Sequence, residues 1–227
     1  MIGQAGVGKS EFWSHGDKTF YIDTEGNIAH LATMNLPARS WSDFVEIGGL
    51  LFKSKQDGKL TYDTLVVDTV DKLIDYASEE VINRARAKFE KAISAGLEIN
   101  TIGDIPEGQG WFALKGLMTN YLDKLVKLGM AVVLIGHTQI KEIKDPVKKF
   151  DKNTINIGGQ LGTMLLGWAN HIMNIEGIQS GNSLIRTVYT RPTQSREAKS
   201  HGGIIPDTWK WDVDMAVNYK KLRGLFE

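Results

Sequence analysis

The sequence contains no cysteine, only five prolines and no net charge at pH 7. The absence of cysteine excludes disulfides and thiolate zinc sites, and it fits a reducing compartment. Because 27 basic residues balance 27 acidic residues, nucleic-acid binding would have to come from a local basic patch. No apolar run reaches the roughly 18 residues that span a bilayer, and glycines and a lysine follow Met1 where a secretion signal would be apolar. We therefore expect a cytoplasmic protein with no membrane partner.

The 227 residues, 42% of them hydrophobic, are enough for one domain with a full core. Short β-branched runs alternate with helical patterns, which predicts an α/β fold with a mainly parallel sheet flanked by helices. The last two expected strands are joined by a short IQSGNS link, which indicates an antiparallel C-terminal hairpin. We expect one domain over residues 1–205 and a C-terminal tail, residues 206–227, that packs on it. The expected strands are 19–23, 64–68, 131–136, 171–176 and 184–189; the expected helices are 9–14, 41–51, 70–93, 111–128 and 159–169; the expected long loops are 95–110 and 141–158.

A glycine-rich segment near the N-terminus, GQAGVGKS, matches the P-loop pattern G-x-x-x-x-G-K-S. Consecutive backbone N–H groups of such a loop form an anion cradle at a helix N-terminus, and glycines let the backbone lie close to phosphate oxygens. Lys9 would reach the β- and γ-phosphates, and the Ser10 hydroxyl would ligate Mg²⁺. The alternative is a chance match in a glycine-rich turn. The pattern predicts ATP and Mg²⁺ as cofactors, with the nucleotide contacted by Gly3, Gln4, Ala5, Gly6, Val7, Gly8, Lys9, Ser10 and Glu11.

A P-loop normally follows a buried parallel strand, but only Met1 and Ile2 precede this one. Two residues are too few for the strand that we expect. Either the first strand is truncated, which we favour, or another segment takes its place in the sheet.

A hydrophobic strand that ends in a carboxylate follows in LVVDTVDKL, residues 65–73. Asp68 would lie at the carboxyl end of this strand, beside the P-loop, and hold Mg²⁺ through water, as the Walker B aspartate does. Alternatively, Asp68 caps the following helix, and Thr69 is a second candidate for that cap.

The segment FYIDTEGNIAHL, residues 20–31, is more specific. It resembles the second strand of the RecA/RadA recombinase family, in which YIDTEG is a recurring string. The resemblance implies that Glu25 activates the attacking water, with Asp23 beside it at the strand end. In-line attack on a γ-phosphate requires a group that orients water opposite the leaving group. The alternative is a plain turn made by Asp23, Glu25 and Gly26.

A further strand, in VVLIGHTQIKE at residues 132–142, ends in polar side chains. In RecA-like ATPases a polar residue here senses the γ-phosphate and signals to the next loop. The resemblance implies this role for His137, with Gln139 as second choice; a solvated strand end is the alternative. The following KEIKDPVKKFDKN corresponds to a DNA-contacting loop, where lysines and an aromatic could hold single-stranded DNA. A solvated, mobile loop is equally consistent with it. The candidate DNA contacts are Lys141, Lys144, Lys148, Lys149, Phe150 and Lys152.

The segment YTRPTQSREAKSHGG, residues 189–203, follows the C-terminal hairpin. In oligomeric RecA-like ATPases, basic residues of this region reach the nucleotide held by a neighbouring subunit. The resemblance therefore implies a homo-oligomer with shared active sites, in which Arg196 or Lys199 acts in catalysis and Arg191 is third choice. The alternative is ordinary surface charge.

The order of these motifs over residues 1–205 resembles a RecA-like P-loop NTPase core. It is most similar to compact phage-encoded nucleotide-binding proteins, some of which are RecA-like single-strand annealing proteins. The resemblance implies Mg²⁺-dependent ATP hydrolysis and single-stranded DNA binding in a bacterial or phage-infected cytoplasm. Two other classes remain open: a RecA-like helicase or loader motor, and a switch ATPase that binds protein partners without DNA.

Overall fold

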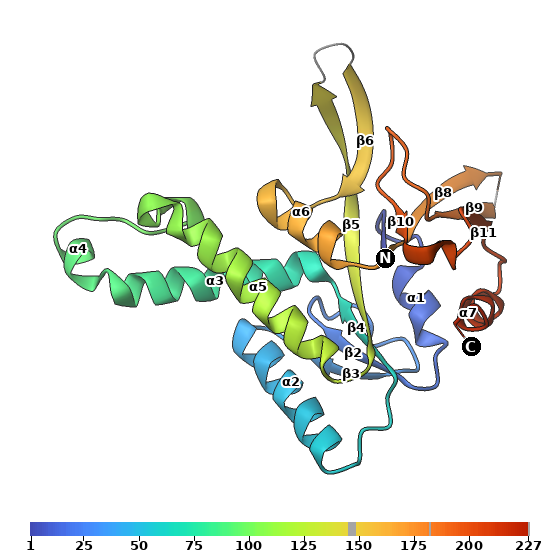
Figure 1. Ribbon diagram of the computed structural model, residues 1–227, viewed down its shortest axis with the longest axis horizontal. Coiled ribbons are helices and arrows are strands. Elements are labelled where there is room, and N and C mark those ends of the chain that lie inside the picture. Colours follow the sequence, from blue (N-terminus) through green and yellow to red (C-terminus); the bar gives the residue numbers. More distant parts are fainter. Residues whose placement is uncertain (145–148, 182, 227) are drawn as a thin grey trace.

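A computed structural model describes residues 1–144, 149–181 and 183–226, with only the backbone of Lys144. Within these residues, nine strands form one central sheet (Figure 1). They are β1 (Ile2–Gly3), β2 (Thr19–Asp23), β3 (Met34–Pro37), β4 (Thr64–Asp68), β5 (Ala131–Lys144), β6 (Lys149–Ile155), β8 (Asn174–Ser180), β9 (Ser183–Tyr189) and β11 (Thr208–Lys210).

The sheet is mostly parallel, in the order β11-β9-β8-β1-β5-β4-β2-β3, and β6 pairs with β5 off this path. The β8–β9 pair is antiparallel, which confirms the predicted C-terminal hairpin. A separate two-stranded sheet joins β7 (His171–Ile172) and β10 (Lys199–Ser200). Every residue of β2 and β4 is buried, as expected for strands covered on both faces of a parallel sheet.

The described residues form seven α-helices; α3 and α5 extend beyond the edge of the sheet, and α4 lies at the far end of α3 (Figure 1). On β4, Leu65 and Val67 face a core shared with α2, α3 and α5, while Val66 faces the opposite side and lies in a second core. This alternation is the period of two of a strand. None of the helices in the described part of the chain is long and apolar enough to cross a membrane. The helices are α1 (Lys9–Ser14), α2 (Trp41–Gln56), α3 (Val70–Lys88), α4 (Glu90–Ser94), α5 (Gln109–Val126), α6 (Gly159–Trp168) and α7 (Met215–Arg223).

Strand β1 occupies the centre of the sheet although it has only two residues. Ile2 pairs with Gly136 of β5 and Asn174 of β8, and Gly3 pairs with His137 and Ile175. A two-residue strand therefore forms here, and each of its residues has a partner on both sides. The expectation that too few residues precede the loop to form a strand is wrong, and so is the alternative that another segment takes this place; truncation of the first strand stays a prediction.

The segment 141–158, expected as a loop, is largely strand. β5 continues to Lys144 and pairs antiparallel with β6, from Thr138 opposite Ile155 to Lys144 opposite Lys149. The resulting β5–β6 hairpin projects from the body of the molecule (Figure 1). The other expected loop, 95–110, contains two short 3-10 helices, η1 (Ile102–Asp104) and η2 (Pro106–Gly108). The expected long helix over 70–93 ends at Lys88, and α4 follows it.

Residues 206–226 of the expected tail form part of the same body. β11 adds to the sheet beside β9, and α7 packs against α1. Phe12 of α1 is fully buried and stacks on Trp211, with ring centroids 4.7 Å apart; Tyr219 lies edge-on to the same ring. The helix that follows the P-loop is thus held by aromatic side chains from the end of the chain.

Candidate nucleotide-binding site

The P-loop turns at the carboxyl end of β1 and leads directly into α1 at Lys9. Gly6 and Gly8 have φ angles of 73° and 93°, a left-handed conformation that favours glycine. A Cβ atom on Gly3 would lie 2.8 Å from the Ile175 carbonyl oxygen, so this position also excludes a side chain. The backbone conformation and close packing of the loop therefore require glycine at these positions, in addition to the predicted need for close approach to phosphate.

Lys9 is buried, with 5% of its surface exposed, and folds back over its own loop. Its Nζ donates hydrogen bonds to the carbonyl oxygens of Gly3 (2.9 Å) and Gln4 (2.8 Å). Burial lowers the pKa of Lys9, while the nearby carboxylates of Asp68, Asp71 and Glu25 oppose that shift. The ammonium group is thus bound to its own loop and is stabilised by the charges of three acids.

Asp68 ends β4 and is almost fully buried. Burial raises the pKa of Asp68, and the charges of Glu25 and Asp23 raise it further; a hydrogen bond from the Ser10 hydroxyl and the charge of Lys9 act the other way. Asp68 is not the cap of α3, because Thr69 is the N-cap residue and its hydroxyl accepts from the Lys72 N–H at 3.4 Å. This settles the alternative left open by the sequence.

The Asp68–Ser10 pair suits Mg²⁺. Hydroxyl and carboxylate oxygens are ligands that Mg²⁺ prefers. Among the described residues, Asp68 Oδ2 is buried without a hydrogen-bond partner. An unpartnered, buried carboxylate oxygen is costly unless a cation or water meets it, so the donor set fits the metal that the motif implies.

Glu25 and Asp23 have different roles at the end of β2. Asp23 Oδ1 accepts the backbone N–H groups of Glu25 (3.1 Å) and Gly26 (2.6 Å), so Asp23 forms the turn. The Glu25 carboxylate instead accepts from the Thr69 hydroxyl at 2.7 Å and from Asn27 Nδ2 at 3.1 Å. Thr69 follows Asp68, so these contacts hold Glu25 beside the end of β4.

His137 is placed next to the P-loop because it pairs in register with Gly3. Its backbone N–H donates to Asp71 Oδ2 at 2.9 Å, and its Nδ1 lies 3.5 Å from the same oxygen. Gln139, the second choice for this role, donates from Nε2 to the Ile155 carbonyl oxygen at 3.3 Å, within the β5–β6 hairpin. Sequence reasoning did not assign Asp71 to the site; the available signal was its place three residues after Asp68, in the first turn of a predicted helix.

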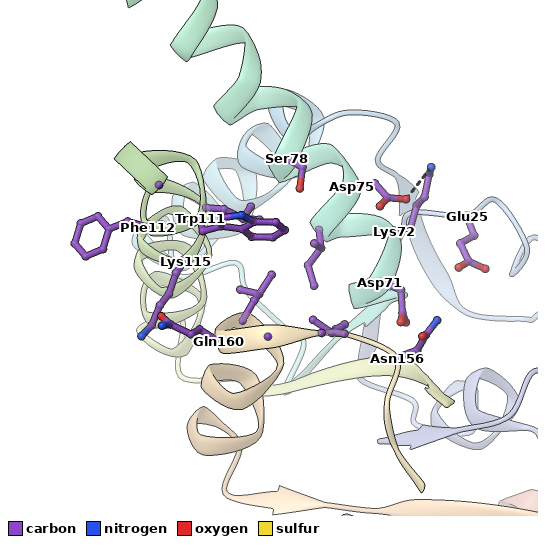
Figure 2. A pocket seen from close by; sticks show the side chains of 17 residues that line it. Glu25, Asp71, Lys72, Asp75, Ser78, Trp111, Phe112, Lys115, Asn156 and Gln160 are labelled. Atoms are coloured by element: carbon purple, nitrogen blue, oxygen red, sulfur yellow. Dashed lines mark hydrogen bonds and ion pairs between the residues drawn. The ribbon is translucent and has the colours of Figure 1, made fainter. Parts of the chain in front are cut away.

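A cavity of about 1080 Å³ opens beside these acids, between α3, α5 and the start of α6 (Figure 2). Glu25 and Asp71 line one end of it, and Trp111 and Phe112 lie at the other (Figure 2). These two aromatic side chains are 60% and 82% exposed. In the sequence, an aromatic pair at the start of a helix is as compatible with a core as with a surface, so Trp111 and Phe112 carry no signal of their own.

The candidate DNA contacts lie on the β5–β6 hairpin. Lys141 is paired opposite Lys152, and Phe150 opposite Ile143. Lys149 Nζ is 3.8 Å from Glu142, and Lys152 Nζ forms a close ion pair with Glu197, at 2.6 Å. Lys148 and the side chain of Lys144 lie outside the described residues.

The candidate residues for a neighbouring active site all contact their own chain. Arg196 binds Glu176 through two hydrogen bonds, of 2.7 and 3.0 Å, and its guanidinium lies 3.5 Å from the centre of the Tyr189 ring. Lys199 donates to the carbonyl oxygens of Gly167 and Ala169 at the end of α6. Arg191 pairs with Asp207 at 3.0 Å.

The glycine-rich loop between β1 and α1, with Asp68 and Glu25 at neighbouring strand ends, defines a P-loop nucleotide-binding protein with a mostly parallel α/β sheet. Residues 1–201 match the AAA domain family, and the chain belongs to this family. The SPbeta prophage-derived uncharacterized protein YorG of Bacillus subtilis (strain 168) is 24% identical over 157 residues, which are 68% of this chain and 45% of that protein. The chain therefore spans less than half the length of this relative.

Among solved structures, a KaiC-like protein of the hyperthermophilic archaeon Pyrococcus horikoshii OT3 is similar. The match has a TM-score of 0.47 and 10% identity, and it covers 95% of this chain and 84% of that one.

Proposed function

We propose that the protein hydrolyses ATP with Mg²⁺ and acts on single-stranded DNA, in phage-type recombination or strand annealing. The observation that carries the first part is the convergence of Lys9, Asp68 and Glu25 at one edge of the sheet, where the charges of Asp68 and Glu25 both act on Lys9. The prophage origin in the name of YorG supports the phage setting.

In this proposal each side chain has a distinct task. Glu25, oriented by Thr69 and Asn27, aligns the attacking water and accepts its proton. Lys9 leaves the carbonyl oxygens of its loop and meets the β- and γ-phosphates, where negative charge builds up in the transition state. Ser10 and Asp68 would hold Mg²⁺, which supplies positive charge to the phosphate oxygens.

The β5–β6 hairpin is the proposed contact for DNA. It projects from the body and carries Lys141, Lys149 and Phe150 (Figure 1). Lysines that meet phosphates and an aromatic ring that stacks on a base are the usual means of gripping a single strand. Lys152 forms an ion pair with Glu197, so we expect it to contribute less to DNA binding than the other lysines.

Shared active sites between subunits are a separate part of the proposal. Because Arg196 is bound to Glu176, a contact with a neighbouring nucleotide requires this pair to open. Mixing Arg196→Ala protein with Lys9→Ala protein should then restore some ATPase activity, since a mixed interface combines an intact P-loop with an intact arginine. Active enzyme that stays monomeric would exclude the sharing.

ATPase activity measured with and without single-stranded DNA tests the main proposal. Wild-type turnover should rise with DNA, and Lys9→Ala should abolish turnover in both conditions. The double variant Lys141→Ala/Lys149→Ala should keep its basal rate and bind DNA more weakly, with a salt dependence flatter by roughly 0.7 per lost phosphate contact. Lys53→Ala, on the last turn of α2, is the matched control and should bind like wild type.

The outcomes separate the three classes that the sequence left open. ATP hydrolysis that ignores DNA favours the switch ATPase. DNA-dependent hydrolysis accompanied by strand separation favours a helicase or loader motor. Stimulation with annealing, and without unwinding, supports the proposed function.

A further inference from the structure

Asp71 has a mostly buried carboxylate whose contacts are with His137. It lies in the first turn of α3, and its side chain is 19% exposed. Oδ2 accepts the His137 backbone N–H at 2.9 Å and lies 3.5 Å from the imidazole Nδ1. Within the described part of the chain, the buried Oδ1 has no hydrogen-bond partner.

The backbone is shaped for this close approach. Gly136 precedes His137, and a Cβ atom at Gly136 would lie 3.3 Å from both Val70 and Ile155 and 3.5 Å from Asp71 Oδ2. The absence of a side chain therefore lets β5 lie directly against the start of α3. The contact between Asp71 and His137 follows from this packing, and it joins residues 66 positions apart.

Three parts of the molecule meet at His137. On one side it pairs with Gly3, the first residue of the P-loop. Its carbonyl oxygen accepts the Asn156 N–H at 2.8 Å, just after the end of β6. The next pair, Thr138 with Ile155, begins the β5–β6 hairpin. In Figure 2, Asp71 and Asn156 lie together at the end of the cavity that Glu25 also lines.

The surroundings of Asp71 disfavour its charged form, which is unexpected for a carboxylate with a purely structural role. Burial raises the pKa of Asp71, and so does the charge of Glu25, while the His137 N–H and the imidazole lower it. An uncharged side chain of the same size would satisfy the backbone N–H without placing a second negative charge near Glu25.

We propose that Asp71 is a positioning residue for ATP turnover, which acts by holding His137. Asp71 Oδ2 accepts the backbone N–H and lies 3.5 Å from Nδ1, so the carboxylate favours the imidazole tautomer with the proton on Nδ1 and leaves Nε2 as the nitrogen offered to the nucleotide. Since His137 also anchors the root of the β5–β6 hairpin, the same contact couples the nucleotide to the hairpin. The inference rests on the proposed ATPase function.

A mutant cycle tests this role. Asp71→Asn keeps the size and one oxygen for the backbone N–H, but it loses the charge that faces Nδ1. We expect kcat for ATP hydrolysis to fall about 10–100-fold, as for other groups that orient a functional histidine, with little change in KM. His137→Ala should be at least as slow, and the double variant no slower than His137→Ala, because Asp71 acts through His137. Asp75→Asn, one turn along α3 on the same cavity and paired with Lys72, is the matched control and should turn over like wild type.

A spectroscopic readout makes the result independent of turnover. In nucleotide-free protein labelled with ¹⁵N-histidine, His137 should carry its proton on Nδ1, and Asp71→Asn should move it to Nε2. Additive losses in the cycle, an unchanged histidine tautomer, or an Asp71→Asn enzyme with wild-type kcat would each overturn the inference. If the wild type does not hydrolyse ATP at all, the proposed function fails, while the tautomer still tests the Asp71–His137 contact.

Discussion

Replacing Asp68 by Asn should stabilise the nucleotide-free protein and weaken its response to nucleotide. Asp68 is 6% exposed, and its Oδ2 has no partner among the described residues. A buried polar group without a partner costs about 1–3 kcal/mol, and a charged one more. The neutral amide removes the charge and its repulsion with Glu25 and Asp23.

Because the amide is still a buried polar group, the gain in the free energy of unfolding is only the extra cost of the charge, about 1–3 kcal/mol at neutral pH. For a domain of this size, each kcal/mol corresponds to a Tm change of about 2–4 °C, so the melting temperature should rise by roughly 2–12 °C. Wild type should in turn gain more from ATP with Mg²⁺, because a ligand at 100 times its Kd adds about 2.7 kcal/mol. The variant has lost a metal ligand and should gain far less.

The raised pKa of Asp68 fixes the direction in which the stability of the folded protein changes with pH. The pKa of Asp68 is raised in the folded state, so the folded protein holds this proton to higher pH than the unfolded chain. Wild-type stability should fall as pH rises from the ordinary aspartate value through the raised one, and the full penalty remains above it. Asp71 is shifted in the same direction, so it contributes a similar slope to wild type and variant alike. The difference between the two proteins isolates Asp68.

Thermal unfolding of the two proteins, with and without ATP and Mg²⁺, from acid to neutral pH, measures all three effects. Asp63→Asn is the control, because Asp63 lies just before the other end of β4 and contacts Arg223 at 3.3 Å on the surface. A nucleotide-free Asp68→Asn protein that melts below wild type would refute the reasoning. So would a variant that ATP with Mg²⁺ stabilises as much as wild type.

Two further predictions concern catalysis and the support of the P-loop. Glu25→Gln should bind ATP with near wild-type affinity in a fluorescence titration yet hydrolyse it at least about 100-fold more slowly, because the amide keeps the shape and can still accept from the Thr69 hydroxyl but cannot accept a proton; wild-type turnover would show that another carboxylate acts. Phe12→Ala should lower the free energy of unfolding by about 3–5 kcal/mol in urea titrations, since the ring is fully buried and stacked on Trp211. A loss below 1 kcal/mol would mean that the aromatic cluster does not support α1.

The sequence predicts the parts of the site that lie in short contiguous motifs. The P-loop, Asp68 and Glu25 each lie in or just after a strand whose apolar run is visible, and parallel strands bring their carboxyl ends to one edge. Four of the five expected strands and the C-terminal hairpin are present for the same reason, with β5 running further than expected. Local pattern was sufficient there because burial on both faces leaves few other choices. The expected strand 171–176 is instead divided into β7, which belongs to the small separate sheet, and β8, which continues to Ser180.

Long-range pairing explains most of what sequence reasoning missed. The contact of Asp71 with His137 spans 66 residues, and that of Arg196 with Glu176 spans 20. No local spacing encodes either of them. The segment 141–158 is rich in lysine, which is typical of a loop; its strand character comes from pairing β5 with β6 and from Ile155, which is buried in the core. β3 and β11 are short additions at the edges of the sheet and carry weak signals of their own.

The aromatic contacts between α1 and the end of the chain bear on how the protein is made. Synthesis proceeds from the N-terminus, so the P-loop and Phe12 leave the ribosome about 200 residues before Trp211 and Tyr219 do. Until those side chains arrive, the six-residue helix α1 lacks its stacked partner and is too short to be stable alone. The helix that follows the P-loop thus becomes rigid only after the segment that contains Trp211 has emerged, and a nascent chain stalled before residue 206 should not retain ATP.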